Sequence, residues 1–210
     1  MTNREQAQLT VKVCGMRDAD NIRASEQLGI DWLGFIFWPK SSRYVAAPPA
    51  YLPQRAKRIG VFVDASIDDV QQHVADYGLY AVQLHGHESP EYIKALSAAN
   101  HQLPIIKAFN IAAPADLEQT KPYEELVDYF LFDAKGKSIG GNGTQFDWTV
   151  LNDYHGQTPF LLSGGIGPDD AEHVKAFRHP QLAGIDLNSR FEVAPALKDI
   201  QKLTTFLTQL

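Results

Sequence analysis

Short runs of β-branched, aromatic and other apolar residues recur along the chain, and each has the length of one buried strand. Between them lie stretches with helical spacing or helix-forming residues. The runs that fit this description are Val11–Cys14, Trp32–Phe37, Ile59–Val63, Tyr80–Leu84, Pro104–Phe109, Tyr129–Phe132, Phe160–Leu162 and Gly184–Leu187. The pattern predicts strands and helices in alternation.

Helical patterning is clear in several of the stretches that separate or follow the predicted strands. These stretches are Asp18–Leu28, Ile67–Tyr77, Pro90–Ala99, Pro168–Phe177 and Pro195–Leu207. Two other connections fit a helix less well. Ala46–Arg55 contains three prolines, which interrupt helical hydrogen bonding, and Pro114–Thr120 is short.

Regular alternation of strand and helix requires right-handed parallel crossovers, which leaves an open doubly wound sheet or a closed barrel. Eight strand-helix units within 210 residues favour the barrel. This length is at the short end for such a fold and leaves little room for a second domain. We therefore expect an α/β protein in which residues 1–210 form a single (β/α)8 TIM barrel with a closed parallel sheet.

Composition narrows the class of protein further. The chain is 44% hydrophobic and 21% charged, as in an ordinary globular protein, and its net charge of -6 without a Lys/Arg cluster argues against a nucleic-acid partner. Its one cysteine, Cys14, excludes an intramolecular disulfide and fits a reducing compartment. The first ten residues lack the apolar core of a signal peptide, and no apolar run spans a membrane. These features predict a cytoplasmic protein.

The active site of a closed parallel barrel lies at the carboxyl ends of its strands, so polar residues there are the first functional candidates. We expect no metal site, because the other histidines show no metal-ligand spacing. The polar and glycine candidates at strand ends are Cys14, Arg43, Gln83, His85, Lys107, Asp133, Ser163, Gly164, Gly165, Asp186, Asn188 and Ser189.

The loops after the seventh and eighth predicted strands suggest a phosphate site. Ser163–Gly167 reads SGGIG, and its glycines let backbone amides approach a ligand closely before Pro168 opens a helix. Barrels commonly use these two loops for phosphate, with Asn188 and Ser189 in the second one. The alternative is that the glycines only form a tight turn.

Cys14 ends an apolar strand, where a lone cysteine often serves as a small core residue. Lys12 lies two residues earlier on the same face, and a neighbouring ammonium lowers a thiol pKa. The sequence therefore favours a partly ionised, reactive thiol. Lys12 could instead pair with Asp186, because the first and eighth strands are neighbours in a closed barrel, and both interactions could coexist.

Other candidates also have a functional and a structural interpretation. Asp133 ends the strand YFLF and could act as a general acid, or only bond the loop backbone. Residues 134–144 after it are rich in glycine, which suits a lid or a plain flexible loop. Arg43 could hold a carboxylate or lie solvated at the surface. His85 could bond substrate hydroxyls or be structural.

The segments that carry these residues resemble the phosphoribosylanthranilate isomerase family of tryptophan biosynthesis. In order from about Val11 to Glu192 they are KVCGMRD, GFIFWPKSSRYV, GVFVD, AVQLHGHE, PIIKAF, LFDAKGKSIGGNGTQFDW, LLSGGI and GIDLNSRFE. The resemblance implies a (β/α)8 barrel that needs no cofactor. It further implies an Amadori rearrangement of N-(5-phosphoribosyl)anthranilate to the 1-deoxyribulose isomer, and a monomer or homodimer.

The resemblance also implies roles for individual residues. Cys14 would be the general base, Asp133 the general acid, and Arg43 the ligand of the anthranilate carboxylate. Further substrate contacts would come from Lys12, Gln83, His85, Gly141 and Asp186, and phosphate contacts from Ser163, Gly164, Gly165, Asn188 and Ser189.

One position departs from the family pattern, because Arg190 stands where the family more often has glycine. An arginine would be strained there if the backbone needed a positive φ, and it could add charge toward the phosphate. Two alternatives remain. A phosphosugar isomerase of the histidine pathway would carry paired aspartates where this chain has Cys14 and Lys107, which argues against it. A non-catalytic phosphosugar-binding barrel is the other.

Overall fold

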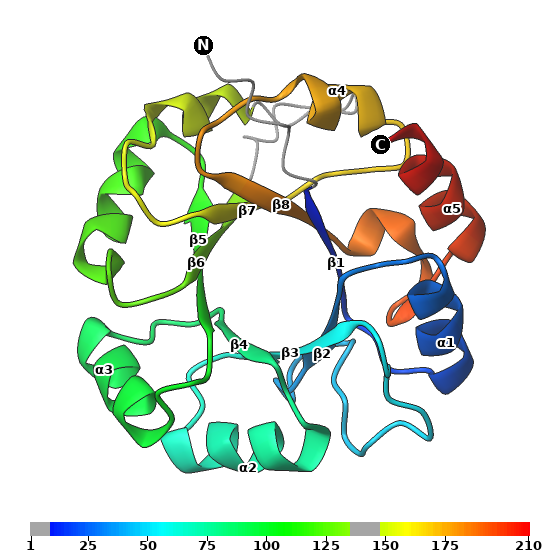
Figure 1. Cartoon of the computed structure of the whole chain (residues 1–210), viewed down its shortest axis with the longest axis horizontal. Helices are drawn as coiled ribbons and strands as arrows, with labels where there is room; N and C mark the ends of the chain where they lie inside the picture. Colours follow the sequence, from blue (N-terminus) through cyan, green and yellow to red (C-terminus); the bar gives the residue numbers. More distant parts are fainter. Residues whose placement is uncertain (1–8, 135–147) are drawn as a thin grey trace.

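A computed structural model describes residues 9–134 and 148–210, so the predicted substrate contact Gly141 lies outside the described residues. The strands close into one parallel barrel in the order β1 to β8, with helices and loops around it (Figure 1). Its strands are β1 Thr10–Cys14, β2 Trp32–Ile36, β3 Lys57–Phe62, β4 Ala81–Leu84, β5 Ile105–Ile111, β6 Tyr129–Ala134, β7 Phe160–Ser163 and β8 Leu182–Leu187. The predicted fold class is confirmed.

The outer layer combines α-helices with shorter 3-10 helices. Its α-helices in the described ranges are α1 Ala19–Gln27, α2 Ile67–Tyr77, α3 Pro90–Ala99, α4 Ala171–Ala176 and α5 Ile200–Gln209. The 3-10 helices are η1 Pro114–Tyr123, η2 Trp148–Asp153 and η3 Ser189–Phe191. A small hairpin of β9 Glu192–Ala194 and β10 Leu197–Lys198 follows η3, so the helix predicted from Pro195 begins only at Ile200.

Two apolar layers hold the barrel together. The larger cluster packs barrel residues against the helices, and a smaller one is made of Trp32, Ile59, Ala81, Ile106, Ala108, Leu131 and Leu161. Leu131 and Leu161 each precede by two positions a residue of the cavity described below, Asp133 and Ser163. Since side chains alternate along a strand, the smaller cluster faces inward and forms the floor of that cavity.

The second crossover, between β2 and β3, runs without a helix, as its prolines suggested (Figure 1). The buried carboxylate of Glu26 on α1 organises it, accepting hydrogen bonds from the Tyr51 hydroxyl and the backbone amides of Arg55 and Ala56. Burial opposes ionisation of Glu26, but these hydrogen bonds outweigh it and lower its pKa to about 2. A single carboxylate therefore replaces the missing helix as the anchor of this loop.

We predict that Glu26→Gln destabilises the protein by about 1–3 kcal/mol at pH 7, because the amide leaves backbone donors poorly paired. The pKa of Glu26 is lower in the folded than in the unfolded chain. Its stabilisation is therefore present above the unfolded pKa and lost as pH falls toward about 2. Urea unfolding at several pH values should show the difference between variant and wild type shrinking on acidification.

The exposed Glu118, paired only with Lys121, supplies the matched control Glu118→Gln, for which we expect little change. A Glu26→Gln variant as stable as this control at pH 7 would contradict the anchoring role.

Candidate active site

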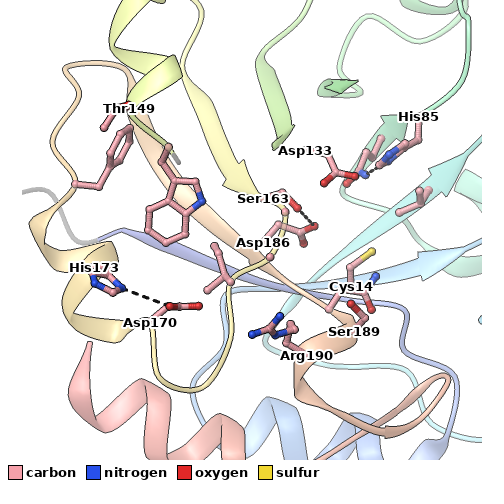
Figure 2. A pocket seen from close by; sticks show the side chains of 18 of the residues that line it. Cys14, His85, Asp133, Thr149, Ser163, Asp170, His173, Asp186, Ser189 and Arg190 are labelled. Atoms are coloured by element: carbon pink, nitrogen blue, oxygen red, sulfur yellow. Dashed lines mark hydrogen bonds and ion pairs between the residues drawn. The ribbon is translucent and has the colours of Figure 1, made fainter. Parts of the chain in front are cut away.

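A polar cavity of about 1030 Å³ opens at the carboxyl ends of the strands. Figure 2 shows Cys14, His85, Asp133, Ser163 and Asp186 directed toward its centre from separate strands. Most of the candidates predicted from the sequence line it, namely Cys14, Gln83, His85, Asp133, Ser163, Gly164, Gly165, Asp186, Asn188 and Ser189. The barrel thus brings together residues from positions 14 to 189.

Three candidates do not line this cavity. Lys12 lies beneath it, and Arg43 turns toward Glu192. The ammonium of Lys107 is buried and donates to the carboxylate of Glu88 at 3.1 Å and to the backbone oxygen of Gly86 at 2.8 Å. Lys107 is therefore a structural cation that ties β5 to the loop after β4.

Lys12 and Asp186 form a buried ion pair across the join between β1 and β8. Their Cα positions are register partners, and Lys12 Nζ lies 2.7 Å from Asp186 Oδ1. The Ser163 hydroxyl donates to the other Asp186 oxygen at 3.2 Å. Burial alone would lower the pKa of Lys12, but Asp186 raises it. The ion pair expected as one alternative is thus present.

Cys14 differs from expectation in its acidity. Burial raises the pKa of the Cys14 thiol, Lys12 lowers it only in part, and the charge of Asp186 raises it again. The prediction that Lys12 gives a thiol of low pKa is therefore wrong. The main reason is burial, since Cys14 is only 3% exposed, and Asp186 in addition offsets part of the effect of Lys12.

Gly34 on β2 makes room for this cluster, which the sequence did not indicate. A Cβ at Gly34 would lie 2.8 Å from Cys14 Sγ and 3.2 Å from Lys12 Nζ. The Gly34 carbonyl also accepts from the amides of Gly15 and Met16. A glycine at this position thus lets thiol and ammonium approach one another.

On the opposite side, β4 and β6 present an imidazole and a carboxylate. Gln83 Nε2 lies 2.9 Å from His85 Nδ1, so a donating amide leaves the His85 proton on Nε2. Burial lowers the pKa of His85, although the nearby charges of Asp133 and Asp186 oppose this, and a neutral ring is favoured at pH 7. Asp133 is the penultimate residue of β6, is in register with Ser163 and is half-buried.

The loops after β7 and β8 form the far wall of the cavity. Gly164 and Gly165 have φ of +88° and +73°, a backbone conformation that only glycine adopts easily. The Gly167 amide is already bonded to Asp170 at 2.7 Å, and the helix predicted from Pro168 begins only at Ala171. Anion-binding amides would therefore come from the start of this loop.

Arg190 carries no backbone strain. The non-glycine residues with positive φ in the described ranges are Asp64, Glu125 and Ala196. The Arg190 guanidinium extends over the strand-seven loop, with Nε 3.1 Å from the position of a Cβ on Gly167. Figure 2 shows it at the edge of the cavity on the same side as Ser189.

Two further charged residues escaped prediction. Glu192 accepts two hydrogen bonds from Arg43 Nε and one from Arg43 Nη2, and Lys198 Nζ lies 2.7 Å from its other side. Glu192 stood in a segment with no strand or helix pattern, and Lys198 lies beyond it in a stretch predicted as helix. Only the fold brings both to Arg43.

Within the described ranges, no three His, Cys, Asp or Glu side chains are grouped so as to hold a metal ion. The described helices include none that is long and apolar enough to cross a membrane.

A closed parallel barrel with a polar cavity at the carboxyl ends of its strands defines a TIM-barrel enzyme. Residues 11–209 match the family model of N-(5′-phosphoribosyl)anthranilate (PRA) isomerase, and the chain belongs to this family. The family resemblance seen in the sequence is thereby confirmed.

Similar proteins support the assignment over nearly the whole chain. N-(5′-phosphoribosyl)anthranilate isomerase of Phocaeicola vulgatus is 50% identical over 202 residues, which cover 96% of this chain and 98% of that relative. The crystal structure of phosphoribosyl anthranilate isomerase from Thermus thermophilus matches with a TM-score of 0.79 and 31% identity, covering 96% and 98% of the two chains.

A second solved structure is that of a phosphoribosyl anthranilate isomerase in complex with reduced 1-(o-carboxyphenylamino)-1-deoxyribulose 5-phosphate. It matches with a TM-score of 0.79 and 26% identity, and covers 96% of this chain and 98% of its own.

The electrostatics of Cys14 yield a prediction on its acidity. Asp186→Asn removes a negative charge beside the thiol and frees Lys12, so the Cys14 pKa should fall. Because Cys14 is the only cysteine, the pH dependence of iodoacetamide alkylation reports it alone. Asp170→Asn, in the same cavity but outside the Lys12 cluster, should leave the profile near wild type. Equal profiles for all three proteins would contradict the assigned coupling.

Proposed function

We propose that this chain converts N-(5′-phosphoribosyl)anthranilate into 1-(2-carboxyphenylamino)-1-deoxyribulose 5-phosphate by an acid/base-catalysed Amadori rearrangement. The observation that carries the proposal is that Cys14 on β1 and Asp133 on β6 line the same cavity in a member of the PRA isomerase family. No cofactor takes part in the proposed reaction.

In the proposed mechanism Asp133 protonates the furanose ring oxygen, and the ring opens to a protonated Schiff base. The thiolate of Cys14 then takes the C2′ proton, the electron pair of that C–H bond forms the C1′=C2′ double bond, and the π pair of the C=N bond moves onto the nitrogen to give an enolamine. Tautomerisation of the enolamine gives the ketone. The raised thiol pKa makes the thiolate scarcer at neutral pH but a stronger base when formed.

Charge development in the substrate fits the surroundings of these two residues. The protonated Schiff base acidifies C2′, so the thiolate needs only modest strength. The neutral His85 and the amide of Gln83 could hold the ribose hydroxyls without adding charge. Lys12, closed in an ion pair beneath Cys14, would act on the substrate through its charge, whereas its partner Asp186 lines the cavity and could contact the substrate directly.

For the phosphate we propose the loops after β7 and β8. Support comes from Gly164 and Gly165, whose positive φ and missing side chains let backbone amides approach a ligand closely, and from Ser163 and Ser189, whose hydroxyls can donate to it. The side-chain oxygen Oδ1 of Asn188 accepts a hydrogen bond from Lys198 Nζ at 2.7 Å, so Asn188 would donate to the phosphate through its side-chain NH2 group.

Other features of the protein also remain proposals. We propose that residues 1–210 act as a single catalytic domain in the cytoplasm, where the lone thiol would stay reduced. We also propose that the chain is a monomer or a homodimer. Light scattering after gel filtration would distinguish the two.

The catalytic assignment predicts large losses of turnover on Cys14→Ala and Asp133→Asn. General acid or base catalysis contributes about 10²–10⁴-fold, so kcat should fall by that order while binding of a product analogue is kept. The measurement is turnover of freshly made substrate. Asp153→Asn, an exposed carboxylate on η2, is the matched control.

Full activity of either variant would remove that residue from its role. An inactive wild type that still binds the product analogue would favour the alternative of a non-catalytic phosphosugar-binding barrel.

Arg190 should assist phosphate binding from the rim of the cavity. Because it is exposed, Arg190→Ala should raise KM by no more than about fivefold and leave kcat nearly unchanged. The effect should diminish at high salt, which screens exposed charges. An unchanged KM at low salt would show that Arg190 does not act on the phosphate.

A further inference from the structure

Arg43 is held at one edge of its guanidinium by Glu192. Its Nε lies 2.9 Å and 3.1 Å from the two Glu192 oxygens, and its Nη2 lies 2.6 Å from Oε2. The two hydrogens on Nη1 and the second hydrogen on Nη2 take no part in this pairing and form the other edge of the guanidinium. A bidentate pair of this kind fixes the plane of the guanidinium as well as its position.

Glu192 is itself fixed from the other side. Its side chain is 5% exposed, and it also accepts from Lys198 Nζ at 2.7 Å and from the Ala196 amide at 3.2 Å. Lys198 is held in turn, because its backbone amide and carbonyl bond to the side chain of Asn21 on α1, each at 2.8 Å. Glu192 is thus part of a rigid support and not a loose surface partner.

The arrangement also balances charge. Burial opposes ionisation of Glu192, but the bonds from Arg43 and Lys198 lower its pKa below the usual value. Burial lowers the pKa of Lys198, and Glu192 at 2.7 Å offsets this lowering only in part. Two cations then share one carboxylate, so the cluster keeps one net positive charge. Without Lys198, Glu192 would cancel the charge of Arg43.

The cluster lies beside the catalytic loop. A Cβ on Gly15 would lie 2.7 Å from Arg43 Cδ and 3.1 Å from Asn188 Oδ1. The Arg43 side chain therefore crosses the backbone directly after Cys14, and the Asn188 oxygen that Lys198 holds lies at the same place. The Arg43 side chain therefore lies against the residue that directly follows Cys14, the residue proposed to act on the substrate.

We propose that Glu192 is a positioning residue for Arg43, and that Lys198 offsets the Glu192 charge so that the free edge of Arg43 can bind the anthranilate carboxylate. The inference deepens the proposed function and rests on it. A fixed fork loses less conformational entropy when it binds a planar carboxylate than a mobile arginine does. Glu192 and Lys198 would therefore determine specificity for the carboxylated aromatic ring.

The opposite possibility is that Glu192 competes with the substrate for Arg43. The two possibilities predict opposite signs, because removal of a positioning carboxylate weakens ligand binding, whereas removal of a competitor strengthens it. The additional bonds of Glu192 to Lys198 and Ala196 favour positioning.

The experiment compares two probes by isothermal titration calorimetry. One is the reduced product analogue that carries the 2-carboxyphenylamino group, and the other is the same sugar phosphate with an unsubstituted phenylamino group. For Glu192→Gln we expect about tenfold weaker binding of the carboxylated probe, and less than about twofold change for the other. Steady-state kinetics should show a raised KM with kcat kept within about threefold.

Two further variants keep the test decisive. Glu192→Asp preserves the charge but shortens the side chain by one methylene. It should selectively weaken binding of the carboxylated probe. Lys198→Met should do the same, because the Arg43–Glu192 pair then has no net charge. The exposed Lys202→Met, on α5 close in sequence, is the matched control.

Tighter binding of the carboxylated probe by Glu192→Gln, no change, or equal losses for both probes would each overturn the inference. Wild-type turnover is measured in the same series. A wild type that binds both probes but does not convert the substrate would refute the proposed function instead, whatever the variants do.

Discussion

The buried ion pair of Lys12 and Asp186 is the interaction on which the site depends. It joins the first strand of the barrel to the last, in a register that fixes where β1 ends relative to β8. Removing one partner from such a pair typically costs about 3–5 kcal/mol, because the other charge stays buried and unpaired. Because the ion pair lies beneath the cavity, the same two residues both close the barrel and determine the charge near Cys14. Ser163 extends the same network to β7.

Cys14 shows how this network controls chemistry. A lysine beside a thiol is usually taken to make it acidic, yet here the lysine is shared with a carboxylate, and burial dominates. The result is a thiol that is mostly protonated at rest. Once ionised, such a group is a stronger base than an ordinary thiolate, which fits the removal of a carbon-bound proton that we propose for it. Gly34 keeps Lys12 close enough for the ammonium to stabilise the thiolate once it appears.

The sequence was informative about the fold and the strand ends because both depend on local pattern. The strands were located to within a few residues, and Cys14, His85 and Asp133 lie in the cavity as expected. Prolines after β2 indicated the missing helix, but nothing local indicated that Glu26 would replace it. The sign of the Cys14 shift was missed because it depends on burial and on a carboxylate 172 residues away in the chain.

Lys107 shows that a candidate residue chosen by its place in the sequence can have a structural role instead. Its place on a strand made it a candidate, but its ammonium donates to the Glu88 carboxylate and to the backbone oxygens of Leu84, Gly86 and Ala108. Glu192 and Lys198 were overlooked for the reverse reason, since neither lies at the end of a predicted strand: Glu192 follows the last strand in a segment without a pattern, and Lys198 lies in a stretch that was predicted as helix but forms part of a short hairpin. Lys12 and Arg43 pair with carboxylates from the opposite end of the chain, which the closed barrel brings close to them. Spacing along the sequence cannot predict such pairs.

The order of the chain has a consequence for its synthesis. Lys12 and Arg43 are made early, but their carboxylate partners, Asp186 and Glu192, follow more than 140 residues later. Until the last strand and the hairpin after it have been made, the buried Lys12 and the half-buried Arg43 lack the carboxylates that neutralise them in the folded protein. These two ion pairs can therefore form only late in synthesis, however early β1 and the loop after β2 are made.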